Sequence, residues 1–415
     1  MAWRSGAPRT ISPPARTSTS TTVPEAPLAV LPSHFLGFPR SDGRVGVRNY
    51  LVVVSAVALV NRWAELIAAS LPDARAIAGE FMRGLRKPDA ARQARVCEAL
   101  ATHPNVGACL VLCHDAASAR LWREYLADCG RPHAVLALME QNGMEAAIQA
   151  GQRALAQLDE MRRSVARQRS PFSALTLALE CGGSDPTSAL IANPAIGRVV
   201  DAVIDAGGSA IVSETVEFVG AEAPVRALCR SPRVAKDLLA AIAAAEQRME
   251  EDGERYRGVN PTAENIEAGL TTLVEKSMGA VAKVGSRSFA GLLEFGEKPA
   301  TPGLYLMDTP FFSPCSITGM IAAGAQLTLF GMGVFNPSGN PLAPTVKVCG
   351  NPMTVARWND AIDADLSDVL AGGATLDQAA QRLGAFLVET VEGRETRAER
   401  WREGQFIVPK TLTPL

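Results

Sequence analysis

Residues 51–60 read LVVVSAVALV and form the longest apolar run of the chain. Their β-branched content predicts a buried strand, because the run is far shorter than the roughly 18 residues of a membrane-spanning helix. A helical pattern follows as far as Leu71. The same order returns at residues 106–112 and 134–138, each of which precedes an amphipathic stretch. This alternation predicts a parallel sheet covered by helices.

The pattern starts again in the second half of the chain. The polar segment RRSVARQRS at residues 162–170 is typical of an interdomain linker. An amphipathic helix is predicted at 233–250 and a final helical region at 353–391. Further strands are predicted at 173–179, 210–212, 303–307, 326–330 and 345–348. The fold class is therefore α/β with two domains, 37–165 and 166–415, each with a mostly parallel sheet flanked by helices.

Residues 1–36 differ from the rest, since they are crowded with Ser, Thr, Pro and Ala and hold no acidic residue before Glu25. An Arg- and Ser-rich, acid-poor leader is typical of a transit peptide. A disordered tail, or a gene start assigned too early, is the interpretation that we prefer.

The composition excludes several classes of protein. The 415 residues carry a net charge of −2, so we expect no nucleic-acid partner, and no run is long enough to span a membrane. Eight cysteines without a CxxC pair fit neither a disulfide framework nor a zinc ribbon. All four histidines lie in the first third, which excludes a His-rich site in the remainder. We expect a cytoplasmic protein.

Three polar clusters follow predicted strands, and the carboxyl ends of parallel strands gather ligands. The glycines of the first cluster allow close approach of a ligand, and their N–H groups suit a carboxylate or phosphate oxygen. The alternative to ligand binding is a helix N-cap for Ser184 and Asp185, and a turn for Asp308 and Thr309. The clusters are Glu180 to Asp185 followed by Asn193, Ser213 to Glu217, and Asp308 with Thr309.

Two further stretches combine glycine with polar residues. The first holds Thr271, Thr272, Lys276 and Lys283, where a buried lysine is suited to an anionic substrate. A surface helix with a solvated Lys276 is the alternative. The second stretch begins at Thr318 and includes a Gly-rich loop at 331–339, which matches no nucleotide-binding fingerprint.

Residues 37–49, GFPRSDGRVGVRN, resemble the opening motif of the altronate/galactarate dehydratase family, and the later clusters fall in that family's order over residues 37–400. The resemblance implies a hydro-lyase that dehydrates a sugar acid to a 2-keto-3-deoxy acid with Fe²⁺ or Mn²⁺. It also implies a homo-oligomer. A related branch, the sulfolactate sulfo-lyase large subunit, expels sulfite instead and works with a small SAF-domain subunit. That branch is the second hypothesis.

Cysteines that such relatives place after the first strand are replaced here by Ser55 and Ala56, which makes a non-catalytic acid-binding paralogue a third hypothesis. β-Elimination needs a base, an acid for the departing hydroxyl, and cationic help for the enediolate. We assign catalysis to Glu214, Lys276 and Asp308, and metal binding to Cys181 and Glu217. Cys181 as a small buried residue is the alternative. Substrate binding is assigned to Gly182, Gly183, Ser184, Asp185, Asn193, Thr271, Thr272, Thr309 and Thr318.

Overall fold

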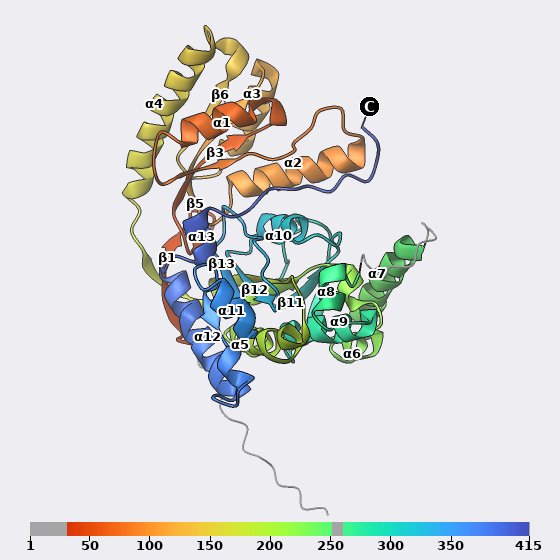
Figure 1. The fold of residues 1–415 in the computed structure, drawn as a ribbon. Coiled ribbons are helices and arrows are strands. Elements are labelled where there is room, and N and C mark those ends of the chain that lie inside the picture. The colour runs from red at the N-terminus through yellow and green to blue at the C-terminus, as the bar shows by residue number, and fades with distance from the viewer. Residues whose placement is uncertain (1–30, 251–259, 415) are drawn as a thin grey trace, which may run out of the picture.

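The computed structural model describes residues 31–250 and 260–414, so most of the predicted tail lies outside it. Figure 1 shows two lobes, the first built from the N-terminal third of the chain and the second from the rest. Within the described ranges, no helix is both long and apolar enough to cross a membrane. The predicted α/β class, with two mostly parallel sheets flanked by helices, is confirmed. The exact domain boundary stays a prediction.

The first lobe is a four-stranded parallel sheet with helices on both faces. Leu51 and Val53 face α1 and α4, while Val52 and Val54 face α2 and α3, so the whole strand is buried as its apolar run predicts. The strand order is β4 (Ala74–Ile77), β3 (Tyr50–Ser55), β5 (Val106–Cys113) and β6 (His133–Ala137). The helices are α1 (Asn61–Ala68), α2 (Lys87–Ala101), α3 (Ala116–Leu126) and α4 (Met144–Arg163).

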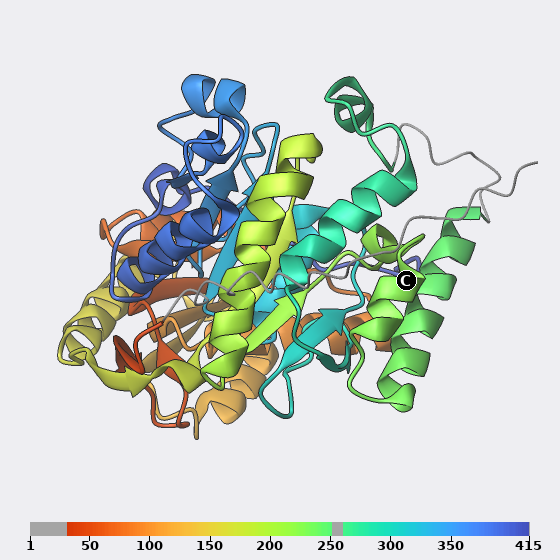
Figure 2. The ribbon, with the colours of Figure 1, turned by 90° about the horizontal axis from the view of Figure 1, so that it is seen from below.

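The second lobe contains a seven-stranded sheet in which every neighbouring pair is parallel. Figure 2 shows helices α5 (Asn193–Asp205), α12 (Leu376–Val391) and α9 (Leu273–Val281) on the face that looks away from the first lobe. The strand order is β10 (Phe289–Leu293), β11 (Leu304–Met307), β9 (Ser209–Val212), β8 (Thr176–Cys181), β12 (Leu327–Met332), β13 (Thr345–Cys349) and β14 (Ala364–Asp365). The remaining helices are α6 (Glu222–Ala227), α7 (Pro232–Glu250) and α8 (Ala263–Glu267).

Two predicted elements are wrong in detail. The first strand ends at Ser55, because the chain turns there with the Ser55 hydroxyl donating to the Val57 carbonyl, and a 3-10 turn leads into α1. The final helical region is interrupted after α11 (Pro352–Arg357) by β14 and a glycine turn before α12 begins. Gly372 in that turn has a φ of 73°, a conformation that glycine adopts without strain.

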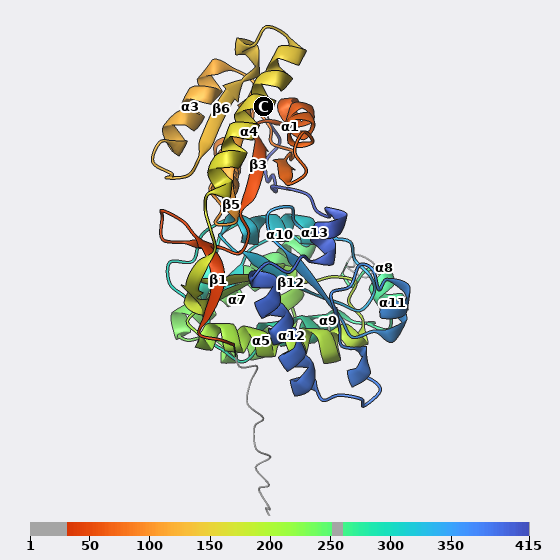
Figure 3. The same ribbon diagram turned by 90° about the vertical axis from the view of Figure 1, so that its left-hand side faces the viewer.

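The predicted linker is largely regular structure. Helix α4 continues to Arg163, and β7 (Gln168–Pro171) follows after a few residues. β7 pairs with β1 (His34–Pro39), which also pairs with β2 (Val45–Gly46), in a small antiparallel sheet at the junction of the lobes. Figure 3 shows this narrow junction from the side. The segment is polar because a helix end and an edge strand are exposed, not because it is unstructured.

The two lobes share one apolar core. Val96 and Leu100 of α2 belong to the same buried cluster as Ile317 and Ile321 of α10 (Ser313–Ala322). The segment after α13 (Arg397–Trp401), residues 402–414, then crosses back to the first lobe and runs along α2 (Figure 1). We call it the C-terminal segment. The Asp89 carboxylate of α2 accepts hydrogen bonds from the backbone N–H groups of Thr411 and Leu412.

The opening motif at 37–49 has a structural role. Arg40 donates to the Pro104 and Arg48 carbonyls, and the Arg48 guanidinium makes two 2.8 Å hydrogen bonds to the Glu399 carboxylate. Glu399 also accepts from the Tyr50 hydroxyl. Burial opposes ionisation of Glu399, but Arg48 overrides it and lowers the pKa of the carboxyl to about 2. The motif therefore holds the start of β3 in contact with Glu399, near the end of the chain.

Candidate functional site

The carboxyl ends of β8, β9, β11 and β12 meet at one edge of the large sheet. β9 lies on one side of β8 and β12 on the other, because the chain passes from β8 to β9 and later crosses to the opposite side of β8 as β12. A strand order of this kind opens a crevice beyond the strand ends, which is where open α/β sheets bind ligands. The predicted clusters at 180–185, 213–217 and 308–309 all follow these strands.

A buried ion cluster fills the base of this edge. The Lys283 Nζ lies 2.7 Å from a Glu217 oxygen and 3.0 Å from the Cys181 Sγ. The Lys276 Nζ lies 3.6 Å from the other Glu217 oxygen. Burial alone raises the pKa of Glu217, but the two lysines outweigh it and hold the pKa below its ordinary value. Glu217 is therefore ionised and anchors both lysines.

Glu180 is the last but one residue of β8 and is completely enclosed. Its carboxylate accepts hydrogen bonds from the Ser213 and Ser313 hydroxyls, at 2.8 and 3.1 Å. Burial, opposed by Lys283 and reinforced by Glu217, raises the pKa of Glu180 to about 7. A carboxyl that titrates near neutrality thus lies behind the site.

Glu214 follows β9 in a left-handed backbone conformation, with φ 60° and ψ 70°. A non-glycine residue pays about 1–3 kcal/mol for this conformation, and such strain gathers at functional sites. The Thr309 hydroxyl holds it by accepting the Glu214 N–H at 2.8 Å. Burial, with Glu180 and Glu217 nearby, raises the pKa of Glu214 well above its ordinary value. Burial and the two neighbouring carboxyls therefore favour the protonated form of Glu214.

Glu214, Lys276 and Cys181 line a cavity of about 720 Å³. Ser313 and the Phe311 ring lie on one side, with the Lys276 Nζ 4.1 Å from the ring centroid. Residues outside the second-lobe sheet complete the wall, namely Glu403, Gly404 and Gln405 of the C-terminal segment. Glu403 pairs with Lys347 of β13, whose side chain is buried. The cavity therefore combines buried charged groups with a larger apolar lining.

The two glycines of the first cluster are needed for loop packing. A Cβ on Gly183, whose φ is 61°, would lie 2.1 Å from the Val334 carbonyl oxygen. The Gly182 N–H already donates to the Gly331 carbonyl at 3.1 Å. Our expectation that the Gly182 N–H holds a ligand oxygen is therefore wrong, because the loop after β12 uses that donor.

The structure brings part of the predicted set together. Cys181, Gly182, Gly183, Ser184, Glu214 and Lys276 line the cavity, and Glu217 and Thr309 contact these residues from behind. The surface-helix alternative for Lys276 is wrong, since its side chain is only 5% exposed.

Other predicted site residues lie outside the cavity wall. Asp185 accepts from the Ser188 N–H, which is the helix-capping alternative, and also from Asn351. Thr272 and Thr271 cap α9 together with Glu275, one residue before Lys276. Asp308 accepts from the Thr215 hydroxyl, Asn193 donates to the Gly279 carbonyl, and Thr318 accepts the Ile407 N–H of the C-terminal segment. These six orient neighbouring segments.

Sequence reasoning missed several residues of the site. Glu180 carried a signal, because a glutamate at the end of an otherwise apolar strand is unusual in a buried sheet. Lys283 was named only in the same stretch as Lys276 and was given no role of its own. Ser313, Phe311 and Glu403 gave no local signal, since only the fold brings them to this edge.

The predicted metal ligands do not fit a divalent ion. Lys283 lies against both Cys181 and Glu217, so a cation already occupies the space between them. Burial and Glu217 also raise the pKa of the Cys181 thiol to about 12, so it keeps its proton, whereas metal ligation needs the thiolate. Over residues 31–250 and 260–414, no three His, Cys, Asp or Glu side chains are grouped as a metal site. We derive no step through a metal.

Comparison with known proteins gives a consistent match over both lobes. Residues 37–163 match the family model for the second domain of D-galactarate dehydratase/altronate hydrolase, and residues 172–413 match the D-galactarate/altronate dehydratase C-terminal model. The chain is 30% identical to (2R)-sulfolactate sulfo-lyase subunit beta of Chromohalobacter salexigens, over 91% of this chain and 97% of that one. It is 32% identical to altronate dehydratase of Escherichia coli, over 88% and 75% of the two chains. Galactarate dehydratase (L-threo-forming) of Escherichia coli is 28% identical, over 63% and 49%.

Proposed function

Because the chain belongs to the D-galactarate/altronate dehydratase family, we propose that it is a lyase that dehydrates a sugar acid to a 2-keto-3-deoxy acid. The observation that carries the proposal is the placement of Glu214, whose pKa burial raises, and Lys276 on the wall of one cavity. An acid–base group and a cation are the two functions that β-elimination from a hydroxy acid requires.

In this proposal Lys276 binds the substrate carboxylate and stabilises the enediolate charge. The ionised form of Glu214 removes the proton next to the carboxylate. The Glu214 acid then gives that proton to the departing hydroxyl, which leaves as water, and the resulting enol becomes the 2-keto acid. Glu214 ends the cycle ionised as it began. Its raised pKa makes the rare ionised form a strong base, as general bases need to be.

We include dependence on Fe²⁺ or Mn²⁺ in the proposal only because the family resemblance implies it. A metal would supply a Lewis acid for the enediolate. The ligands assigned to it here, Cys181 and Glu217, contact Lys283 instead. The proposed proton transfers use the chain's own residues alone.

Substitution of Glu214 by Gln tests the assignment, with a panel of aldonates and aldarates as substrates. We expect kcat/KM to fall by about 10²- to 10⁴-fold. It should also rise with pH in the parent chain as Glu214 loses its proton. Glu267→Gln, an exposed position on α8 outside the cavity, is the matched control. Unchanged activity in the Glu214 variant would remove Glu214 from the mechanism, and no turnover by the parent chain would favour the acid-binding paralogue.

A sulfo-lyase is the second candidate, because the Chromohalobacter relative matches almost end to end and its name marks it as a subunit. The same proton abstraction would then expel sulfite instead of water. Measuring sulfite and keto acid released from sulfolactate and from aldonates separates the two reactions. On this alternative we expect a separate small SAF-domain subunit. The proposed homo-oligomer is tested by sedimentation of the purified chain.

A further inference from the structure

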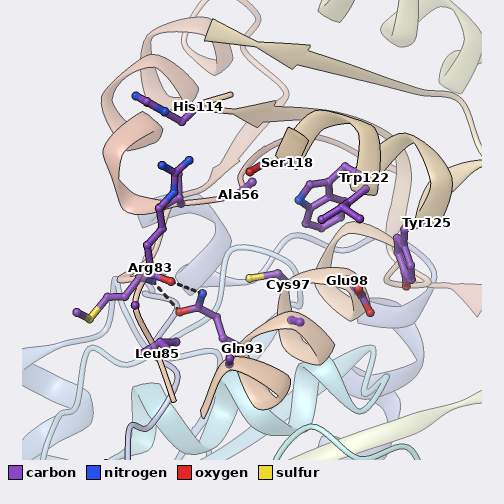
Figure 4. Close-up of a pocket in the computed structure, with 16 residues that line it drawn as sticks. Ala56, Arg83, Leu85, Gln93, Cys97, Glu98, His114, Ser118, Trp122 and Tyr125 are labelled. Atoms are coloured by element: carbon purple, nitrogen blue, oxygen red, sulfur yellow. Dashed lines mark hydrogen bonds between the residues drawn. The ribbon is translucent and has the colours of Figure 1, made fainter. Parts of the chain in front are cut away.

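We propose that the first lobe carries a second binding site, for a small carboxylate with an apolar body, in a cavity of its own. The cavity has a volume of about 360 Å³ and lies between α2, α3 and the loop at residues 82–85 (Figure 4). It shares no lining residue with the cavity that Glu214 and Lys276 line. We call it the first-lobe pocket.

The pocket lies where the topology of the sheet opens a crevice. The strand order is β4-β3-β5-β6. The chain therefore passes from β3 to β4 on one side of β3, and then crosses to β5 on the other side. Helix α1, after β3, covers one face, and α3, after β5, covers the opposite face. Ala56 just after β3 and His114 just after β5 both line the pocket. Ligands bind at such reversal points of parallel sheets.

Cationic and hydrogen-bonding groups gather at one end of the pocket. Figure 4 shows the Arg83 side chain extending from its loop toward His114. The Nδ1 atom of His114 is buried and makes no hydrogen bond within the described chain, and the Asp115 carboxylate lies 3.9 Å from it. The positive end of the eleven-residue helix α3 begins two residues later. These groups suit a carboxylate oxygen pair.

Arg83 already contacts the Asp115 carboxylate, which caps α3 through the Ser118 N–H. The Arg83 side chain is half exposed, and an exposed ion pair of this kind is weak. A guanidinium has five N–H donors, so it can bind a second carboxylate without releasing the first. The existing pair orients Arg83 toward the pocket without occupying it.

Much of the remaining wall is apolar, although Gln93, Glu98, Ser118 and Tyr125 also line it. Leu85 faces the indole of Trp122 across the pocket, and Met82 and Leu121 line it while remaining exposed, at 36% and 63%. Covering apolar side chains of this size with a ligand is favourable, because it removes their surface from water. A ligand that is anionic at one end and aliphatic or aromatic at the other satisfies both parts of the wall. Inorganic anions would leave the apolar part uncovered.

Calorimetric titration of the full chain tests the proposal. Benzoate and hexanoate are the probes, and benzamide is the uncharged analogue of benzoate. We expect saturable binding of both carboxylates, with benzamide at least tenfold weaker. Ala94→Trp places an indole in the pocket from α2, and Ala91→Trp, an exposed position on the same helix outside the pocket, is the control. Binding should vanish in the first variant and persist in the second. Arg83→Gln should weaken the carboxylates at least tenfold and leave benzamide unchanged.

Each other outcome overturns the proposal. Binding that survives Ala94→Trp but is lost in Lys276→Met belongs to the second-lobe cavity. Equal binding of benzoate and benzamide removes the carboxylate from the ligand class. If no probe binds and Ala94→Trp instead changes the mass in sedimentation, the pocket is a contact between copies of the chain. The readout is binding, so it is independent of turnover and of the proposed function.

Discussion

The Nζ of Lys283 lies 3.0 Å from the Sγ of Cys181, at the base of the second-lobe cavity. The same ammonium is shared with Glu217, and all three side chains are buried. A lysine therefore occupies the place between the two residues that the sequence suggests as metal ligands. Its positive charge is what makes a carboxylate tolerable so deep in the protein.

Replacing Lys283 by Met leaves Glu217 buried with Lys276 as its remaining cation. Removing one partner of a buried pair costs about 3–5 kcal/mol. We expect the free energy of unfolding, measured in urea, to fall by that amount. Lys236→Met makes the same substitution at an exposed position of α7 and should change stability by less than about 0.5 kcal/mol. Equal effects of the two variants would contradict the buried cluster.

The Lys283–Cys181 contact also predicts how the protein treats metals. Cys181→Ser should leave the iron and manganese content per chain unchanged in protein purified without oxygen, because the protonated thiol is bound to Lys283 rather than available as a ligand. Elemental analysis of parent and variant side by side checks this. A loss of metal confined to the variant would restore Cys181 as a ligand.

Glu180 predicts a pH dependence of stability. Its pKa is about 7 in the folded protein and near 4.5 in the unfolded chain, so the folded state binds the extra proton between these values. The stability that this carboxyl contributes is complete below about pH 4.5 and is lost as the pH rises through 7. Relative to Glu180→Gln, the parent chain should lose about 2–3 kcal/mol of unfolding free energy between pH 5 and pH 8. Parallel stability curves would show that Glu180 has an ordinary pKa.

The Arg48–Glu399 pair predicts that the opening motif is needed for stability. Arg48→Met leaves the Glu399 carboxylate buried without its bidentate partner, so we expect a loss of about 3–5 kcal/mol in chemical unfolding. Arg382→Met breaks an exposed pair with Asp368 and should cost at most about 1 kcal/mol. A small effect at Arg48 would mean that residues 37–49 are important for another reason.

Local patterns were enough to predict most strands of both parallel sheets, because buried parallel strands such as β3 are long apolar runs, but the short strands β4 and β14 were not predicted. β10 was missed because its five residues include Gly291 and carry no clear alternation. The first lobe's pocket gave no signal, since Arg83 and His114 are 31 positions apart and only the strand order brings them together. Glu214 was found because it directly follows a strand, whereas the role of Lys283 depends on a contact across 102 positions.

The C-terminal segment also has a practical consequence for handling this protein. Gly404 and Gln405 form part of the second-lobe cavity, and Thr411 and Leu412 are fixed on α2, which is itself a wall of the first-lobe pocket. Chain ends are usually where affinity tags and protease trimming do least harm. Here a bulky tag after residue 414, or cleavage near Arg402, would disturb both cavities at once.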